Sequence, residues 1–160
     1  IVAAALAGVN AFTGPRIAAL KEEKTQQAIE LVLPGGGDAV EFPATDLVSK
    51  VYASDTGYAV EVTPTTGFNG AITMMVGIDF EGNILGISIV SHTETAGLGA
   101  VAAATTSAGE EFRGQFVGMS GNVSVSKDGG EVNAITGATI TSRAVCAGVN
   151  AALECVAQMG

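Results

Sequence analysis

The pattern of apolar and polar residues changes along the chain, from an uncharged apolar run to helical and then strand-like segments. Residues 1–12 are mostly small and apolar, and the first charged side chain is that of Arg16. A membrane span needs about 20 apolar residues. We therefore interpret residues 1–14 as the end of a transmembrane helix whose start lies outside this sequence. The alternative, the end of a cleaved signal peptide, lacks a typical cleavage site followed by a polar start.

Residues 17–33 have apolar side chains at a loose spacing of three to four, with charged residues at 21–24, which is typical of a surface helix. Pro34 and the glycines that follow it end this pattern. Residues 15–37 therefore predict a helical stalk and linker, and residues 38–160 a separate domain.

The middle of the chain has the periodicity of strands. Residues 48–53 and 58–62 alternate or run apolar around turn residues, which indicates a hairpin. Residues 71–79 and 84–92 form a second apolar pair around a tight turn at 81–83. Because the connections are short and contain no helices, the pattern predicts an antiparallel meander rather than a parallel sheet.

The second half mixes the two periodicities. Residues 101–114 favour a pair of short helices, whereas 123–127 alternate like a strand and 131–135 favour another short strand after a turn. An apolar stripe predicts a final helix over 143–159. The sequence therefore predicts an α+β fold, with a strand-rich middle and flanking helices.

Four hydroxyl side chains gather just before the final predicted helix, in the stretch Thr136-Gly137-Ala138-Thr139-Ile140-Thr141-Ser142. Thr141 or Ser142 is a suitable N-cap. A helix N-terminus also offers unpaired N–H groups and the positive end of the helix dipole to an anion. The stretch is therefore either an ordinary capped helix or a site for a phosphate-bearing group.

Composition excludes several classes of ligand. The chain has 160 residues and a formal net charge of −9, which argues against nucleic acid and against a polybasic membrane-surface patch. Its one His and two Cys lack metal-ligand spacing, so we expect no metal site. Cys146 and Cys155 would lie roughly 13 Å apart on one helix, too far for a mutual disulfide. We interpret both as small buried hydrophobic residues.

A second informative stretch, His92-Thr93-Glu94-Thr95-Ala96-Gly97-Leu98-Gly99-Ala100, follows a predicted strand and ends in a glycine-flanked turn. Its polar residues are compatible with simple capping. Leu98 is less ordinary, because an apolar side chain on such a turn usually meets a flat or apolar partner.

Together the two stretches resemble an FMN-binding domain family, that of the G subunit of the Rnf electron-transport complex and the C subunit of the sodium-pumping NADH:quinone reductase. Thr136-Gly137-Ala138-Thr139 is similar to the family's S/T-G-A-T flavinylation motif, and the stretch from His92 resembles its H-x-E-T-P-G-L-G segment, in the same order. The stalk and the residues after Thr139 look closer to the Rnf protein than to the quinone-reductase protein.

The resemblance implies an FMN joined through its phosphate to the Thr139 hydroxyl by a phosphoester that a dedicated flavin transferase makes, with Thr141 as the second candidate. It implies an electron-transfer subunit of a membrane-bound, ion-translocating oxidoreductase, without stand-alone catalysis. Its implied partners are a second covalent-flavin subunit and iron–sulfur-bearing membrane subunits. Its implied location is the bacterial cytoplasmic membrane, as a single-pass protein with the soluble domain on the extracytoplasmic side.

For the cofactor site, the resemblance implies that Leu98 and its flanking glycines pack against the flavin ring. Glu94 and Thr95 would form hydrogen bonds to ring or ribityl groups of the flavin, and Lys127 is a candidate cation nearby. The complete set of residues expected around the FMN is His92, Glu94, Thr95, Gly97, Leu98, Gly99, Lys127, Thr136, Gly137, Ala138, Thr139, Ile140 and Thr141.

Two positions depart from the family pattern. Asn133 stands where the family usually has Asp, six residues before the acceptor. If the transferase uses that carboxylate, flavinylation would be slower here or would need another group, such as the nearby Glu131 or Asp128. Ala96 replaces the Pro of the upstream motif, which should cost a fraction of ~0.4–1 kcal/mol through loop rigidity.

Two other functions remain open from the residues. A membrane-anchored extracytoplasmic binding or interaction module without a redox role would leave both stretches as ordinary caps and turns. A protein that uses FMN non-covalently would release its chromophore with acid, and would need a nicotinamide site for which the sequence has no signature.

Overall fold

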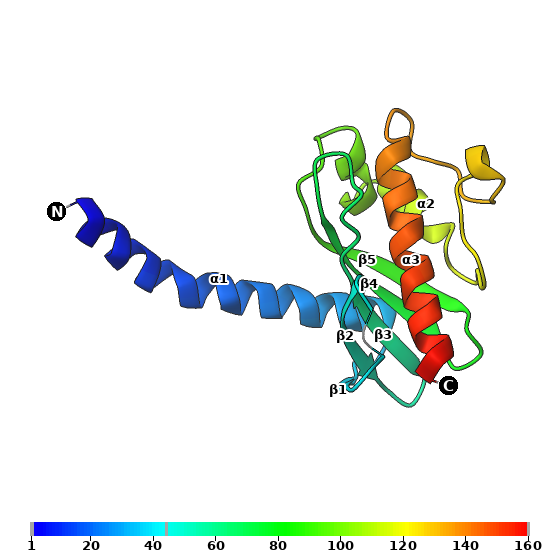
Figure 1. Cartoon of the computed structure of the whole chain (residues 1–160), viewed down its shortest axis with the longest axis horizontal. Helices are drawn as coiled ribbons and strands as arrows, with labels where there is room; N and C mark the ends of the chain where they lie inside the picture. Colours follow the sequence, from blue (N-terminus) through cyan, green and yellow to red (C-terminus); the bar gives the residue numbers. More distant parts are fainter. Residues whose placement is uncertain (1, 44, 160) are drawn as a thin grey trace.

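The computed structural model shows a five-stranded antiparallel sheet covered by helices on both faces (Figure 1). The structure describes the backbone of residues 2–43 and 45–159, and the side chains of residues 15–43 and 45–159. The elements, in chain order, are α1 (Val2–Val32), β1 (Asp38–Val40), β2 (Val48–Ala53), β3 (Gly57–Val62), β4 (Ile72–Asp79), β5 (Ile84–His92), the 3₁₀ helix η1 (Gly99–Ala103), α2 (Ser107–Gly114), the 3₁₀ turn η2 (Ser126–Asp128) and α3 (Thr139–Met159). The predicted α+β class is confirmed.

The sheet is a simple meander in the order β1-β2-β3-β4-β5, with every neighbouring pair antiparallel. Both predicted hairpins are therefore confirmed. In the β4–β5 turn, the Asp79 carboxylate accepts hydrogen bonds from the backbone N–H groups of Glu81 at 2.9 Å and Asn83 at 2.8 Å. The bonds from Asn83 lower the pKa of Asp79 because they favour the carboxylate form.

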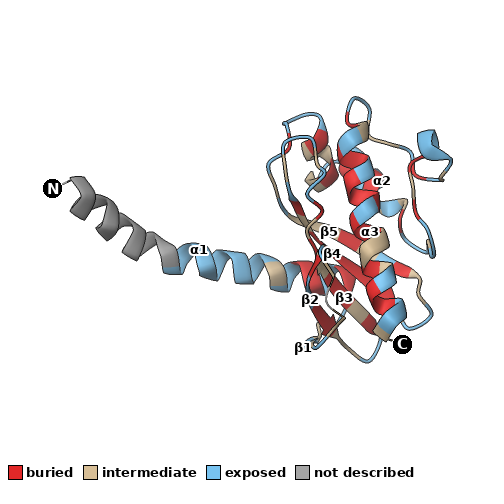
Figure 2. Cartoon of the chain, viewed as in Figure 1, coloured by how far each residue is buried: buried red, intermediate tan, exposed pale blue. Residues whose placement is uncertain are grey.

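Two apolar clusters lie on opposite faces of the sheet. The larger cluster joins α3 and α2 to one face, and its fully buried members include Phe116, Met74, Val76, Val145 and Val149. The smaller cluster, which we call the α1 cluster, consists of Ala28, Ile29, Val32, Leu33, Tyr52, Ala59 and Met75. Because β4 is covered on both faces, it reads as a nearly continuous apolar run. Figure 2 shows the buried residues concentrated in the strands, the inner side of α3 and the last turns of α1.

The long helix α1 contacts the sheet only near its C-terminal end and extends away from the domain (Figure 1). Its last turns lie close to β4, because a methyl group added at Gly77 would overlap the carbonyl oxygen of Val32. The apolar face predicted for residues 17–33 is only partly correct, since Ile17, Leu20 and Leu31 are exposed. These side chains lie outside the contact with the sheet, which the residues of the α1 cluster make instead.

The predicted membrane stub falls on residues 1–14, whose side chains lie outside the part of the chain that the structure describes. The backbone of residues 2–14 belongs to α1, which continues through Pro15. Among the described residues, no helix combines the length and the apolar character that crossing a membrane requires.

The strands predicted at 123–127 and 131–135 are wrong. Within the described residues, this region holds only η2 and a single parallel bridge between Val125 and Val132. Both valines are fully buried, which produces the alternating pattern. Two hydrogen bonds make this bridge, from Ser126 N to Val132 O at 2.7 Å and from Val132 N to Ser124 O at 3.1 Å, and the pairing does not extend into a ladder.

The final helix begins at Thr139, earlier than the predicted start at 143, and so neither Thr141 nor Ser142 is its N-cap. The Ser142 hydroxyl accepts a bond from Ile135 N at 3.0 Å and donates one to Ala138 O at 2.9 Å. These bonds hold residues 135–138 against the first turn of α3, which therefore begins one turn earlier than the sequence predicts. The predicted helix pair at 101–114 is confirmed as η1 and α2.

Candidate functional site

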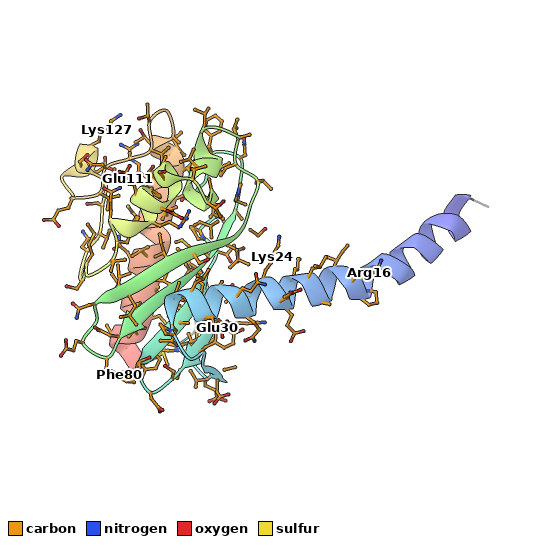
Figure 3. All side chains as sticks on the ribbon, turned by 180° about the vertical axis from the view of Figure 1, so that it is seen from behind. Arg16, Lys24, Glu30, Phe80, Glu111 and Lys127 are labelled. Atoms are coloured by element: carbon orange, nitrogen blue, oxygen red, sulfur yellow. The ribbon has the colours of Figure 1, made fainter. Side chains whose placement is uncertain are left out.

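The two sequence stretches meet at the N-terminal end of α3, where they line one cavity of about 340 Å³. This cavity, which we call the α3 cavity, also receives the η2 turn and the loop before β4. The α3 cavity lies at the end of the domain that carries Lys127, opposite the end that carries Phe80 (Figure 3). The residues that line the α3 cavity are Phe68, Glu94, Thr95, Leu98, Gly99, Lys127, Gly137, Ala138, Thr139, Ile140 and Thr141.

Thr139 is the first residue of α3, and its hydroxyl faces the cation of η2. Lys127 Nζ donates a hydrogen bond to Thr139 Oγ1 at 3.4 Å. The first backbone bond at this end of the helix is from Ser142 N to Ala138 O, at 3.0 Å. Within the described chain, the N–H groups of Thr139 and Ile140 form no hydrogen bond. The first turn of α3 therefore offers free N–H groups, and one ammonium lies beside the Thr139 hydroxyl, which together suit an anion.

The hydroxyl of Thr141 is in a different situation. Thr141 is 1% exposed, and its Oγ1 donates a short hydrogen bond to Glu94 Oε2. The same carboxylate accepts from the backbone N–H groups of Phe68 at 3.3 Å and Asn69 at 3.0 Å. Glu94 is 8% exposed and joins β5, the loop before β4 and α3. Because its carboxylate already bonds to three protein groups, Glu94 shapes the cavity more directly than it offers a free ligand to a cofactor.

Three large apolar side chains border the α3 cavity from three different segments. Phe68 is 66% exposed, Leu98 44% and Ile140 47%. Gly137, whose φ of 76° favours glycine, lies close to Leu98: a methyl group there would be 3.1 Å from the Leu98 side chain. The cavity therefore combines a polar end at Thr139 with exposed apolar walls, as a phosphate and a flat ring would require.

Lys127 is carried by the short η2 turn, and the next residue links this turn to α3. Asp128 forms a bidentate ion pair with Arg143, in which Nε donates to Oδ2 at 2.7 Å and Nη2 donates to Oδ1 at 2.8 Å. The hydrogen bonds from Arg143 lower the pKa of Asp128, and those to Asp128 raise the pKa of Arg143.

Some predicted site residues do not line the α3 cavity. His92 accepts a hydrogen bond from Glu94 N on its Nδ1 at 3.2 Å, and so supports the turn of the same stretch. Gly97, with φ 74°, and the exposed Thr136 lie in the loops of the two motifs but do not line the cavity. Thr95 lines it, and its hydroxyl accepts from Asn69 Nδ2 at 2.8 Å.

Sequence reasoning missed Phe68. It lies in a turn between Gly67 and Asn69, far from both motifs in the sequence, and reaches the site because Glu94 binds the backbone of that turn. The signal that could have drawn attention to it is a large aromatic residue inside a glycine-rich turn. Asn133 lies outside the cavity, and Gln115 holds its backbone through bonds of 2.7 and 3.1 Å.

Among the described residues, no group of three or more His, Cys, Asp or Glu side chains is arranged to hold a metal ion. Both cysteines are buried and free, as the sequence predicts.

The fold and the site define the class of protein to which the chain belongs, the FMN-binding domain family, whose profile matches residues 67–154. The matched region contains both motifs and every residue that lines the α3 cavity. Membership confirms the family predicted from the sequence and supports FMN as the cofactor.

Among known proteins, the chain is similar to G subunits of ion-translocating complexes. It is 32% identical to the G subunit of the Na⁺-translocating ferredoxin:NAD⁺ oxidoreductase complex of Acetobacterium woodii, over 96% of this chain and 84% of that protein. It is 37% identical to the G subunit of the proton-translocating ferredoxin:NAD⁺ oxidoreductase complex of Clostridium ljungdahlii, over 93% and 80%. It is 34% identical to the G subunit of the ion-translocating oxidoreductase complex of Methanosarcina acetivorans, over 98% and 87%.

Proposed function

We propose that this protein is the electron-carrying G subunit of a membrane-bound, ion-translocating oxidoreductase complex of the Rnf type, and that its FMN is covalently attached to Thr139. The observation that carries the proposal is the Thr139 hydroxyl, which stands at the start of α3 beside the Lys127 ammonium. Its neighbour Thr141 is buried and donates its proton to Glu94. When bound, FMN supplies one- and two-electron transfer.

The attachment is a phosphoryl transfer that needs an activated flavin nucleotide, one whose phosphate belongs to a phosphoanhydride. The Thr139 Oγ–P bond forms as the anhydride P–O bond breaks, and the leaving phosphate departs with its nucleoside. The hydroxyl proton passes to the transferase or to water. A separate transferase provides the catalytic groups, since among the described residues the α3 cavity contains no serine–histidine–aspartate arrangement.

The residues of the α3 cavity divide naturally between the two parts of the cofactor. The free N–H groups of Thr139 and Ile140 and the ammonium of Lys127 would hold the phosphate. Phe68, Leu98 and the side chain of Ile140 would contact the ring. A covalent bond prevents dissociation, which suits a carrier that passes electrons between subunits while its ring edge stays accessible.

The cellular setting belongs to the same proposal. The relatives are named as subunits of ion-translocating complexes, and the apolar sequence of residues 1–14 is compatible with a single membrane anchor. The proposed partners are a second covalent-flavin subunit, iron–sulfur-bearing membrane subunits and the flavin transferase. The proposed location is the extracytoplasmic side of the cytoplasmic membrane.

Intact mass spectrometry of the full chain, produced together with a flavin transferase, tests the attachment. We expect a mass gain of one FMN residue and in-gel fluorescence that survives denaturation. Thr139→Val, which removes the hydroxyl but keeps the shape of the side chain, should lose both signals, and Thr139→Ser should retain them.

The matched control is Thr141→Val, which removes the neighbouring hydroxyl and should leave the mass gain intact. Flavin that remains on Thr139→Val would contradict the assigned acceptor. A chromophore that acid releases would favour non-covalent use, and a colourless protein with no mass gain would favour the binding-module alternative.

A further inference from the structure

The η2 turn that carries Lys127 is shaped by its own backbone. Asp128 N donates to Val125 O at 2.9 Å and Gly130 N to the same oxygen at 3.0 Å, and Gly129 ends the turn with a φ of 90°. These bonds fix the form of the loop, but none of them connects it to α3.

The chain before the turn is tied to α3 further along the helix, where Val123 N donates to Asn150 Oδ1 and Asn150 Nδ2 donates to Val123 O, each at 2.7 Å. Those bonds lie about two helical turns beyond Arg143, so the orientation of Lys127 toward Thr139 depends on a contact made by η2 itself.

That contact is the ion pair between Asp128 and Arg143. Arg143 lies one helical turn after Thr139, and Asp128 is next to Lys127 in the sequence. The ion pair therefore joins the neighbour of Lys127 to the turn of α3 that follows Thr139. Apart from the Lys127–Thr139 bond itself, it is the hydrogen-bonded link from η2 to α3 among the described residues. Its two parallel bonds fix direction as well as distance, as the planar guanidinium allows.

The ion pair also sets the local charge. Asp128 is adjacent to Lys127 in sequence and, without Arg143, would compete with a phosphate for the ammonium group. With Arg143 bound, the charges of Asp128 and Arg143 cancel, and the charge of Lys127 remains for the ligand.

We infer that the Asp128–Arg143 ion pair is a positioning clamp, which holds the η2 turn against α3 so that Lys127 faces the phosphate-binding hydroxyl of Thr139. This inference rests on the proposed function of Thr139. In the attachment reaction described above, Lys127 would neutralise negative charge on the phosphate oxygens while the Thr139 Oγ–P bond forms, and would face the finished phosphodiester afterwards. Asp128 and Arg143 do not line the α3 cavity, and they act through Lys127.

Stability is not the main contribution of this pair. Both side chains are about half-exposed, and exposed ion pairs contribute little to the free energy of unfolding. Variants of the clamp should therefore fold, which makes the inference testable on the intact chain.

The test is the initial rate of FMN incorporation into the full chain, with limiting flavin transferase and excess flavin donor, followed by in-gel fluorescence and intact mass. Lys127→Met should slow incorporation by about tenfold or more. Asp128→Asn should also slow it severalfold. This direction is decisive, because removing a negative charge beside a phosphate would accelerate the reaction if charge alone mattered.

The double variant Lys127→Met with Asp128→Asn should be no more than about twofold slower than Lys127→Met alone, since a residue that acts through Lys127 has no effect once Lys127 is lost. In a Lys127→Arg background, which restores a cation, Asp128→Asn should slow incorporation again. Glu154→Gln, which removes an exposed carboxylate from α3 away from the α3 cavity and the clamp, is the matched control and should leave the rate within about twofold.

Asp128→Asn at the wild-type rate or faster would overturn the clamp, as would full additivity with Lys127→Met. Wild-type protein that gains no FMN at all would instead refute the proposed function. The two failures are therefore distinguishable in one series of measurements.

Discussion

At the scale of single residues, a buried carboxylate has to be matched by hydrogen-bond donors. Glu94 meets this requirement with two backbone N–H groups and the Thr141 hydroxyl. Gly99 lies against the pair, where a methyl group would collide with both Glu94 and Thr141. A motif residue that the sequence associates with the cofactor thus organises the protein around it.

Of the two threonines, Thr141 should matter for stability and not for flavin attachment, and Thr139 for flavin attachment and not for stability. Thr141→Val removes the donor to a buried carboxylate and should lower the free energy of unfolding by about 1.5–3 kcal/mol. Thr139→Val, at a half-exposed position, should change it by less than about 0.5 kcal/mol. Urea unfolding of the cofactor-free proteins measures both, and equal losses would contradict the distinct roles of the two hydroxyls.

The sequence identifies both motifs but not which hydroxyl is free. That distinction depends on Glu94, which lies far from Thr141 in sequence and meets it only in the folded chain. Phe68 escapes prediction for the same reason, since its turn is brought to the cavity by its bonds to Glu94.

At the scale of secondary structure, the elements that the sequence predicts correctly are those in which periodicity and hydrogen bonding agree. The β2–β3 hairpin alternates or runs apolar around a turn, the β4–β5 hairpin is a pair of apolar runs around a tight turn, and both pairs of strands are bonded. Residues 123–127 alternate as well, yet Val125 is buried under a loop and not paired in a ladder. Alternation reports which side chains are buried, and it does not reveal whether a neighbouring strand is available.

The close contact of α1 with the sheet predicts opposite effects at two paired glycines. Gly77 and Gly86 face each other across β4 and β5. A methyl group at Gly77 would overlap the Val32 carbonyl, whereas one at Gly86 would lie 3.9 Å from Val32. Gly77→Ala should therefore lower the free energy of unfolding by about 1–3 kcal/mol through overpacking.

Gly86→Ala is the control, and it should be neutral or stabilising, because glycine is unfavourable inside a strand by about 0.5–1 kcal/mol. Thermal or urea unfolding of the two variants measures the difference. A Gly77→Ala protein as stable as Gly86→Ala would show that the last turns of α1 do not rest on β4 as described.

At the scale of the whole molecule, the buried cysteines report on global unfolding. Cys146 and Cys155 are both buried members of the cluster between α3 and the sheet. Burial raises the pKa of Cys146 to about 11 and also raises that of Cys155. At pH 8 about one part in a thousand of the Cys146 thiol would be ionised.

Thiol reagents should consequently label the native chain far more slowly than the chain in denaturant, where both cysteines react. An exposed thiol introduced by Ser120→Cys is the control and should react at once. Rapid labelling of the native wild type would contradict the packing of α3 against the sheet.

The attachment of α1 has a mechanical consequence. The helix has 31 residues and is therefore about 45 Å long, and its final turns belong to the α1 cluster of the core. Because these turns are packed on the sheet, α1 and the sheet should move as one rigid body, and the end of the domain with the α3 cavity should not rotate without α1. A tilt of about 10° at the far end would carry the sheet through roughly 8 Å. Under the proposed function, the orientation of the flavin would therefore follow from whatever holds the far end of α1.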